Sequence, residues 1–132
     1  MPVYNGAKYL NEAIDSILRQ TFKDFEFIII NDGSTDNSLE IIESYQDNRI
    51  VVINQENQGV TVSLNNGIKI AKGKYIARMD ANDISFKDRF KTQTNFLNDN
   101  PDVIVVGSNA DVIDKDGSFV YTQNTSQDNS SL

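Results

Sequence analysis

Oxygen-donating side chains gather at one point of the sequence, at Asp80, Asn82 and Asp83. They follow residues 74–79, a short apolar run that predicts a buried strand. Because side chains alternate along an extended tip, Asp80 and Asn82 would lie on one side and could share a hard cation. Mg²⁺ takes few protein ligands and keeps water or phosphate oxygens at its other positions, so such a cation could neutralise a diphosphate. The alternative is that these side chains only decorate the approach to a helix beginning at Ser85.

A second polar stretch, residues 31–36 (Asn-Asp-Gly-Ser-Thr-Asp), follows another buried run and opens a helix. The Asp32 carboxylate could accept a hydrogen bond from an imide N–H or a ribose hydroxyl, and Gly33 permits a tight turn and the close approach of a ligand. The alternative is a turn in which Ser34 or Thr35 caps the helix. The two interpretations are compatible, because a hydroxyl can cap while the carboxylate binds.

A third loop, residues 2–6, contains Tyr4 and an Asn-Gly pair that is a strong turn signal. The Tyr4 ring could stack on a base or pack against the first helix, and the residues alone leave both readings open. Arg78 stands two residues before Asp80 and could approach a phosphate, but pairing with an acidic neighbour is the favoured role.

Composition excludes several classes of chemistry. The chain has 132 residues, which fits one domain, and it contains no Cys and no His. Thiolate and imidazole metal sites, cysteine nucleophiles and Ser-His-Asp triads are therefore excluded, and any metal must be held by oxygen. The net charge of −7 and the scattered lysines argue against nucleic-acid binding, and they favour a cation beside any anionic ligand.

The sequence also lacks targeting and phosphate-binding signals. No apolar run approaches the length of a membrane span and no secretory signal is recognisable, so we expect a cytoplasmic protein. Neither G-x-G-x-x-G nor G-x-x-x-x-G-K-[ST] occurs, which argues against classical dinucleotide and P-loop binding.

Hydrophobic periodicity predicts alternating strands and helices. The first helix has its apolar side at Leu10, Ala13, Ile14, Ile17 and Leu18, and the third at Val60, Leu64, Ile68 and Ala71. Further helices are expected over residues 36–46 and from Ser85 to a stop at Asn100-Pro101, with Gly73 as the C-cap of the third. Strands are expected over residues 25–30, 50–53, 74–79, 103–106, 110–113 and 119–122, with a turn at 114–117.

Strands that alternate with helices predict an α/β fold with a mostly parallel sheet. In such sheets ligands bind beyond the carboxyl ends of the strands, where residues 2–6, 31–34 and 80–83 all fall. Only Met1 to Tyr4 precede the first helix, so we expect the sequence to begin inside its first strand. The Ser/Asn/Gln-rich residues 123–132 are expected to form a disordered tail.

Four stretches together resemble glycosyltransferase family 2. They are residues 2–6 (Pro-Val-Tyr-Asn-Gly), 20–26 (Gln-Thr-Phe-Lys-Asp-Phe-Glu), 31–36, and 73–80 (Gly-Lys-Tyr-Ile-Ala-Arg-Met-Asp). The resemblance runs from about Met1 to Val106. It implies the GT-A fold, a Rossmann-like three-layer α/β sandwich with a mostly parallel central sheet, here truncated. It also implies a nucleotide-sugar-binding domain over residues 1–122, followed by the tail at 123–132.

The resemblance implies an inverting enzyme that uses a nucleotide-diphospho-sugar donor, most often a UDP-sugar, with Mg²⁺ or Mn²⁺. By position, Tyr4 resembles the base-stacking residue, Pro2 its backbone neighbour, and Asp32 the carboxylate that reads the base.

The same resemblance places Asp80 and Asn82 at the first and third positions of the family's D-x-D motif, so that Asp80 would serve both nucleotide and metal. Asn82 departs from the family pattern, in which the third residue is usually Asp. Asp83 would compensate for the missing charge as a third metal ligand.

No catalytic residue is assigned, because the family's catalytic carboxylate lies well downstream and the 52 residues after Asp80 offer no convincing candidate. We therefore expect the donor-binding half of a bacterial polysaccharide-synthesising enzyme, with little transfer activity alone. Its acceptor would be a saccharide or a lipid-linked saccharide, and the full-length enzyme could lie at the inner membrane face. The alternatives are a non-catalytic nucleotide-binding module and, less favoured, a flavodoxin-like signalling receiver.

Overall fold

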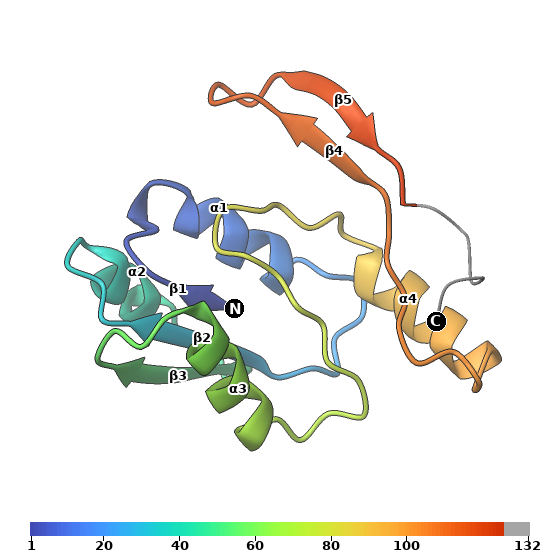
Figure 1. Ribbon diagram of the computed structural model, residues 1–132, viewed down its shortest axis with the longest axis horizontal. Helices are drawn as coiled ribbons and strands as arrows, with labels where there is room; N and C mark the ends of the chain where they lie inside the picture. Colours follow the sequence, from blue (N-terminus) through green and yellow to red (C-terminus); the bar gives the residue numbers. More distant parts are fainter. Residues whose placement is uncertain (126–132) are drawn as a thin grey trace. The chain divides into compact units, whose positions relative to one another are not determined.

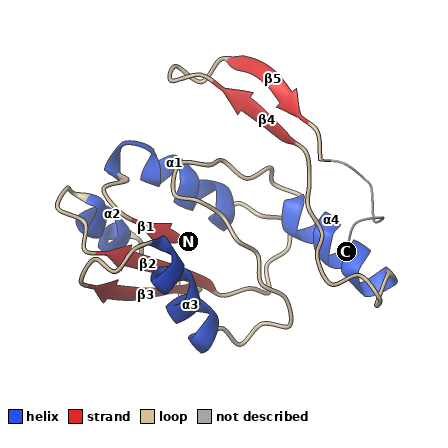
Figure 2. Cartoon of the chain, in the orientation of Figure 1, coloured by secondary structure: helices blue, strands red, loops and turns tan. Residues whose placement is uncertain are grey.

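The computed structural model describes residues 1–125. The chain divides into two compact units, of which the first extends from Met1 to Asn95 and the second begins at Phe96. In chain order the elements are β1 (Pro2–Val3), α1 (Ala7–Leu18), β2 (Phe27–Asp32), α2 (Ser38–Ser44), β3 (Ile50–Gln55), α3 (Val60–Ile70), α4 (Arg89–Asp99), β4 (Ala110–Ile113) and β5 (Phe119–Gln123) (Figure 1, Figure 2).

A parallel sheet of order β1-β2-β3 organises the first unit (Figure 1). Pro2 pairs with Ile30, and β2 pairs with β3 along its whole length. Ile29 of β2 lies in the core with α1 and α2, whereas Ile30 approaches Gly67 of α3. Because successive strand residues point to opposite faces, helices cover the sheet on both sides. The predicted α/β fold with a parallel sheet is confirmed.

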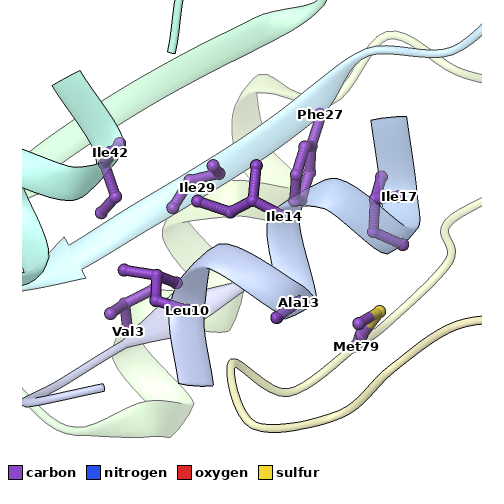
Figure 3. Packing of buried hydrophobic residues seen from close by; sticks show 9 residues of the cluster. All are labelled: Val3, Leu10, Ala13, Ile14, Ile17, Phe27, Ile29, Ile42 and Met79. Carbon is purple, nitrogen blue, oxygen red and sulfur yellow. The ribbon is translucent and has the colours of Figure 1, made fainter. Parts of the chain in front are cut away.

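One hydrophobic cluster holds these layers together. It consists of Val3, Leu10, Ala13, Ile14, Ile17, Phe27, Ile29, Ile42 and Met79 (Figure 3). The predicted apolar side of the first helix is confirmed, because four of its five residues are in this cluster and Leu18 packs against it. Burying a side chain of this size contributes about 1.5–3 kcal/mol. The cluster therefore fixes β1 and α1 on either side of the loop that joins them.

The second unit contains the last residues of α4 and an antiparallel hairpin of β4 and β5. Its turn is the predicted one at residues 114–117, where Gly117 has φ 83° and donates its N–H to the Asp114 carbonyl at 3.0 Å. Gln123, the first residue of the predicted tail, is the last residue of β5. Residues 126–132 of that tail lie outside the described residues.

Two predicted strands, at residues 74–79 and 103–106, are wrong: neither segment is part of a sheet. A strand needs a hydrogen-bonded neighbour, and apolar character alone does not supply one. In the first segment only Met79 is buried. In the second, Ile104 and Val105 are 85% and 80% exposed.

Two helix boundaries also differ from expectation. The last helix begins at Arg89, not at Ser85, because the Ser85 side chain is buried and accepts a hydrogen bond from Gln20 Nε2 at 3.2 Å. Gly73 is not the C-cap of α3, whose C-cap is Ala71. The backbone N–H groups of Lys72 and Gly73 instead donate to the Glu26 carboxylate.

The buried side of α3 was also predicted wrongly. Val60 and Ile68 are both 54% exposed, whereas Ser63 and Gly67 are buried. Small side chains let this helix approach the sheet closely, and of the predicted apolar side only Leu64 and Ala71 are half-buried. Within the described part of the chain, no helix is long and apolar enough to cross a membrane.

Candidate functional site

A pocket opens in the first unit at the carboxyl ends of β1 and β2. Its volume is about 390 Å³, which lies within the range of small-molecule sites. The residues that line it are Pro2, Tyr4, Asn5, Gly6, Tyr9, Asp32, Val60, Asp80, Ala81 and Asn82. Three segments that are far apart in the sequence therefore meet at one depression. Residues 2–6 and Asp32 lie at the carboxyl ends of β1 and β2, as expected from the sequence, whereas no strand precedes residues 80–82.

The loop between β1 and α1 presents Tyr4 to this pocket. Val3 is 1% exposed and belongs to the core, whereas the next residue, Tyr4, is 56% exposed. The ring is therefore not part of the buried core, and Tyr4 lines the pocket. Base stacking by Tyr4 stays a prediction.

Asp32 is the most enclosed polar group of the pocket. It is 3% exposed and its carboxylate accepts hydrogen bonds from Gln55 Nε2 at 2.7 Å, from the Gln58 N–H at 2.9 Å and from the Gly59 N–H at 2.9 Å. Burial by itself raises the pKa of Asp32, but these hydrogen bonds outweigh it, and the net pKa lies below the ordinary value. The carboxylate therefore stays ionised.

These contacts give Asp32 a structural role that the sequence analysis did not anticipate. Gly59 is the N-cap residue of α3 and its side chain cannot cap, so Asp32 satisfies N–H groups at the start of that helix. Gly33 fits beside the same turn, because its φ is 70° and a Cβ there would lie 2.6 Å from the Asn57 nitrogen. Of these three bonds, Oδ2 of Asp32 accepts the one from Gly59, and Oδ1 accepts the other two.

Asp80 also lines the pocket, and its side chain forms an ion pair with Arg78. The Arg78 Nη2 atom is 2.9 Å from Oδ1 and 3.2 Å from Oδ2 of Asp80. The predicted pairing of Arg78 with an acidic neighbour is thus observed. The two side chains are 61% and 44% exposed, so the pair is open to solvent and readily broken.

The remaining two predicted metal ligands are placed differently. Asn82 lines the pocket with Asp80, but Asp83 does not. The Asp83 N–H closes a turn onto the Asp80 carbonyl at 3.3 Å, and its carboxylate acts electrostatically on Arg89, raising the pKa of that guanidinium against the larger lowering that burial causes. Five of the six predicted site residues therefore line one pocket, with Asp83 outside it.

The oxygen donors at the pocket mouth fit a hard cation that shares its shell with a ligand. Within the described residues no three acidic side chains are close enough to enclose a metal. One carboxylate and one amide oxygen, from Asp80 and Asn82, match the few protein ligands that Mg²⁺ takes when a diphosphate and water supply the rest. The donor set fits such an ion only together with its anionic partner.

The start of α1 belongs to a further network that sequence reasoning missed. Asp36 Oδ2 accepts the Ala7 N–H at 3.1 Å, and Ser38 Oγ accepts the Gly6 N–H at 3.0 Å. The sequence placed Asp36 in the first turn of its own helix. Nothing in the local pattern signals a partner 29 residues away.

Comparison with protein families gives one match along nearly the whole chain. The model of the family described as "Glycosyl transferase family 2" matches residues 1–131. Glycosyltransferase GlyG of Streptococcus pneumoniae is 40% identical over 124 residues, covering 92% of this chain and 41% of that protein. An uncharacterized glycosyltransferase of Rickettsia prowazekii is 48% identical over 107 residues, covering 80% of this chain and 33% of that protein.

Solved structures agree with this match. S. aureus TarS 1-349 in complex with UDP-GlcNAc has a TM-score of 0.69 and 31% identity, covering 74% of this chain and 30% of that chain. The same TarS segment in complex with UDP has a TM-score of 0.64 and 28% identity, again covering 74% of this chain and 30% of the other. The chain thus spans less than half the length of these relatives.

Proposed function

The chain belongs to glycosyl transferase family 2, and from this premise we propose that its pocket binds the nucleotide diphosphate of a UDP-sugar donor for transfer to an acceptor hydroxyl with inversion. The observation that carries the proposal is the meeting of Pro2, Tyr4, Asp32, Asp80 and Asn82 around a single depression. The structures of TarS with UDP and with UDP-GlcNAc support a donor of this class.

The nucleoside end of the donor belongs at the Tyr4 side of the pocket. The exposed Tyr4 ring stacks on the base and Pro2 borders it. Asp32 offers its remaining acceptor capacity on Oδ2 to an imide N–H or a ribose hydroxyl. Because Asp32 also holds the start of α3, it reads the ligand from a fixed position.

The diphosphate belongs at the Asp80 side. Helix N-termini often hold phosphates, but the first N–H groups of α1 are already bonded to Asp36 and Ser38. That leaves the mouth of the pocket, where Asp80 and Asn82 would hold Mg²⁺ or Mn²⁺. When bound, the ion supplies charge neutralisation of the departing diphosphate. Arg78, released from Asp80, contributes a further positive charge beside it.

Two carboxylates line the pocket, and the proposal uses both of them for the donor. The Asp32 carboxylate is buried and hydrogen-bonded, and Asp80 is assigned to the metal ion. We therefore place the base that deprotonates the acceptor outside this pocket, and we expect the isolated chain to bind the donor without appreciable transfer. The same observation favours a second candidate function, a nucleotide-binding module without catalysis. Transfer by the whole protein, assayed as sugar release from the donor, separates the two.

The test is calorimetry of the chain with UDP, with and without Mn²⁺. UDP is expected to bind more tightly when Mn²⁺ is present, and absence of binding in both conditions would overturn the proposal. Asp32→Ala is expected to weaken UDP binding even without metal, whereas Asp80→Ala is expected to remove the benefit of Mn²⁺.

Asp83→Ala is the matched comparison for Asp80→Ala, because it removes a carboxylate three positions away that does not line the pocket. We expect the Mn²⁺ benefit to persist in this variant. Loss of the benefit in Asp83→Ala would show that Asp83 is a metal ligand, as the sequence analysis expected. Retention of the benefit in Asp80→Ala would show that the metal is held elsewhere.

A further inference from the structure

Two helices begin at the pocket, and neither carries its own cap. Gly6 is the N-cap residue of α1 and Gly59 that of α3, and neither helix has a side-chain cap hydrogen bond of its own. The first N–H groups of a helix have no partner within the helix and must find one elsewhere. Both sets of partners come from the end of β2 and the residues that follow it, since Asp32 serves α3 and Asp36 with Ser38 serves α1.

The segment Ser34–Ser38, which we call the clamp loop, holds the β1–α1 loop residue by residue. Ser34 Oγ accepts the Asn5 N–H at 3.0 Å, Ser38 Oγ accepts the Gly6 N–H at 3.0 Å, and Asp36 Oδ2 accepts the Ala7 N–H at 3.1 Å. Three consecutive backbone donors are therefore fixed by three side chains of one short loop. The Asp36 carboxylate also lies at the positive end of the α1 dipole, which favours its charge.

Asn5 returns the contact in the opposite direction. Its Oδ1 atom accepts the Thr35 N–H at 2.8 Å and the Thr35 hydroxyl at 3.3 Å. Asn5 has φ 50°, the only positive φ of a non-glycine residue among those described. Asn is one of the few residues that adopt this region readily. The side chain and the backbone of Asn5 are thus both engaged in the same clamp.

The clamp loop fixes the backbone next to Tyr4. Val3, on one side of Tyr4, is buried and paired with Asn31 of β2. Asn5, on the other side, is fixed by the clamp loop. The Tyr4 side chain is more than half exposed, so packing contributes little to its orientation, and its position over the pocket depends on the backbone at both flanks.

We propose that Asn5 and Asp36 are positioning residues of the nucleotide site: they act through the β1–α1 loop to hold Tyr4 in the conformation that receives the base. The inference rests on the proposed function. It adds that the Ser34–Ser38 clamp loop preorganises the part of the pocket that receives the nucleobase, around Tyr4, and does not affect metal binding at Asp80 and Asn82. Preorganisation of this kind raises affinity because the loop no longer has to be ordered on binding.

Calorimetry with uridine and with UDP on the 132-residue chain tests this inference. In Asp36→Ala and Asn5→Ala we expect both ligands to bind about tenfold more weakly, with the ratio of UDP affinities with and without Mn²⁺ unchanged. Asn5→Gly removes Oδ1 but keeps the backbone freedom at φ 50°, so its loss should be smaller than that of Asn5→Ala. If Asp36→Ala does not fold, the comparison of Asn5→Gly with Asn5→Ala still tests the inference.

The control variant is Asp47→Asn. Asp47 pairs with Arg49 at 2.8 Å just before β3, at the sheet edge opposite the pocket, and does not line the pocket. It is expected to lower stability while leaving uridine and UDP affinity unchanged. If Asp47→Asn lost as much affinity as Asp36→Ala and Asn5→Ala, the loss would come from lower stability in general, and the inference would be overturned.

The following outcomes distinguish a failure of this inference from a failure of the proposed function on which it rests. Wild-type affinity for uridine and UDP in Asp36→Ala and Asn5→Ala would overturn the clamp and leave the donor site standing. Absence of UDP binding by the wild-type chain would overturn both. A loss confined to the Mn²⁺-dependent part of UDP binding would also contradict the clamp, because it would place the effect at the Asp80 side.

Discussion

Two carboxylates of the pocket, Asp32 and Asp80, differ in what already binds them. Asp32 is buried and accepts hydrogen bonds from the turn that begins α3. The Asp80 side chain is 44% exposed and forms an ion pair with the exposed guanidinium of Arg78. A rigid carboxylate suits recognition of a directional hydrogen bond, whereas an accessible one suits a cation that arrives with its ligand. This difference supports the proposed division of roles, with Asp32 at the nucleobase and Asp80 at the metal ion.

Replacing the Asn82 amide with a carboxylate would add one negative charge to the proposed metal site. Its amide oxygen is a weaker ligand than a carboxylate, because it brings no negative charge to the ion. Asn82→Asp is therefore expected to strengthen Mn²⁺ binding about tenfold. The measurement is a titration with Mn²⁺ followed by electron paramagnetic resonance of the free ion, first without and then with UDP.

A control for this prediction must add the same charge elsewhere. Asn48→Asp does so in the turn before β3, which is at the opposite edge of the sheet from the pocket. It should leave Mn²⁺ affinity almost unchanged, since exposed charges at that separation are screened by salt. Equal strengthening by both variants would mean that only the net charge had changed, and would remove Asn82 from the metal site.

At the scale of elements, α3 shows how side-chain size sets the distance between a helix and a sheet. Ser63 and Gly67 are its buried residues, and a Cβ on Gly67 would lie 3.0 Å from Ile30 Cδ1. The helix thus lies as near to β2 as the Ile30 side chain allows. Its first residue, Val60, lines the pocket, so a shift of the helix would change the shape of the pocket.

Gly67→Val is expected to destabilise the fold by about 1–3 kcal/mol, because the branched side chain overpacks the contact with Ile30. Urea unfolding measures this change. Asn65→Val is the matched control, since it places the same β-branched residue at an exposed position of the same helix. Were Asn65→Val as destabilising as Gly67→Val, the effect would come from helix propensity and not from the contact with the sheet.

The elements that the sequence predicted correctly are those with strong local signals. The apolar side of α1 has regular spacing, and β2 and β3 are apolar runs bounded by polar residues, although β2 extends two residues beyond its predicted end at Ile30. The meeting of residues 2–6 with Asp32 also followed from sequence, because the parallel strands β1 and β2 bring their carboxyl ends together. Residues 80–82 line the same pocket although no strand precedes them in the structure.

Other features could not be read from local pattern. Residues 74–79 have the composition of a strand, but pairing depends on a neighbour that composition does not reveal. The buried side of α3 is made of small residues, so the periodicity of large ones pointed to the wrong face. The bond from Ala7 to Asp36 joins two loops across the fold. Such contacts depend on tertiary structure alone.

At the scale of the whole molecule, several acidic residues stabilise the fold by binding helix N-termini and by forming an ion pair. The sequence has 19 acidic and 12 basic residues. Several carboxylates hold backbone or guanidinium donors in the folded state: Asp32 at α3, Asp36 at α1, and Asp47 with Arg49 before β3. The fold therefore depends on these groups being ionised, which links its stability to pH.

The direction of that link follows from the pKa shifts. Hydrogen bonds from Ser38 and from the Ala7 N–H lower the pKa of Asp36, and the hydrogen bond from Arg49 lowers the pKa of Asp47 to about 2. The pKa of Asp32 is lowered as well. In the unfolded chain an aspartate has a pKa of about 3.9. The stabilisation by these groups is therefore complete above that value and is lost as the pH falls toward their folded-state values.

We accordingly expect the free energy of unfolding, measured with urea, to change little through these groups between about pH 7 and pH 5 and to fall steeply between about pH 4 and pH 2. Asp47→Asn should be less stable than the wild type at neutral pH and should converge with it as the pH falls through about 2, because the folded wild-type carboxyl becomes protonated there. A constant difference between the two proteins across this range would show that Asp47 contributes through packing and not through its charge. Uridine binding by the same two proteins at neutral pH should be equal, since the Asp47–Arg49 pair lies away from the pocket lining.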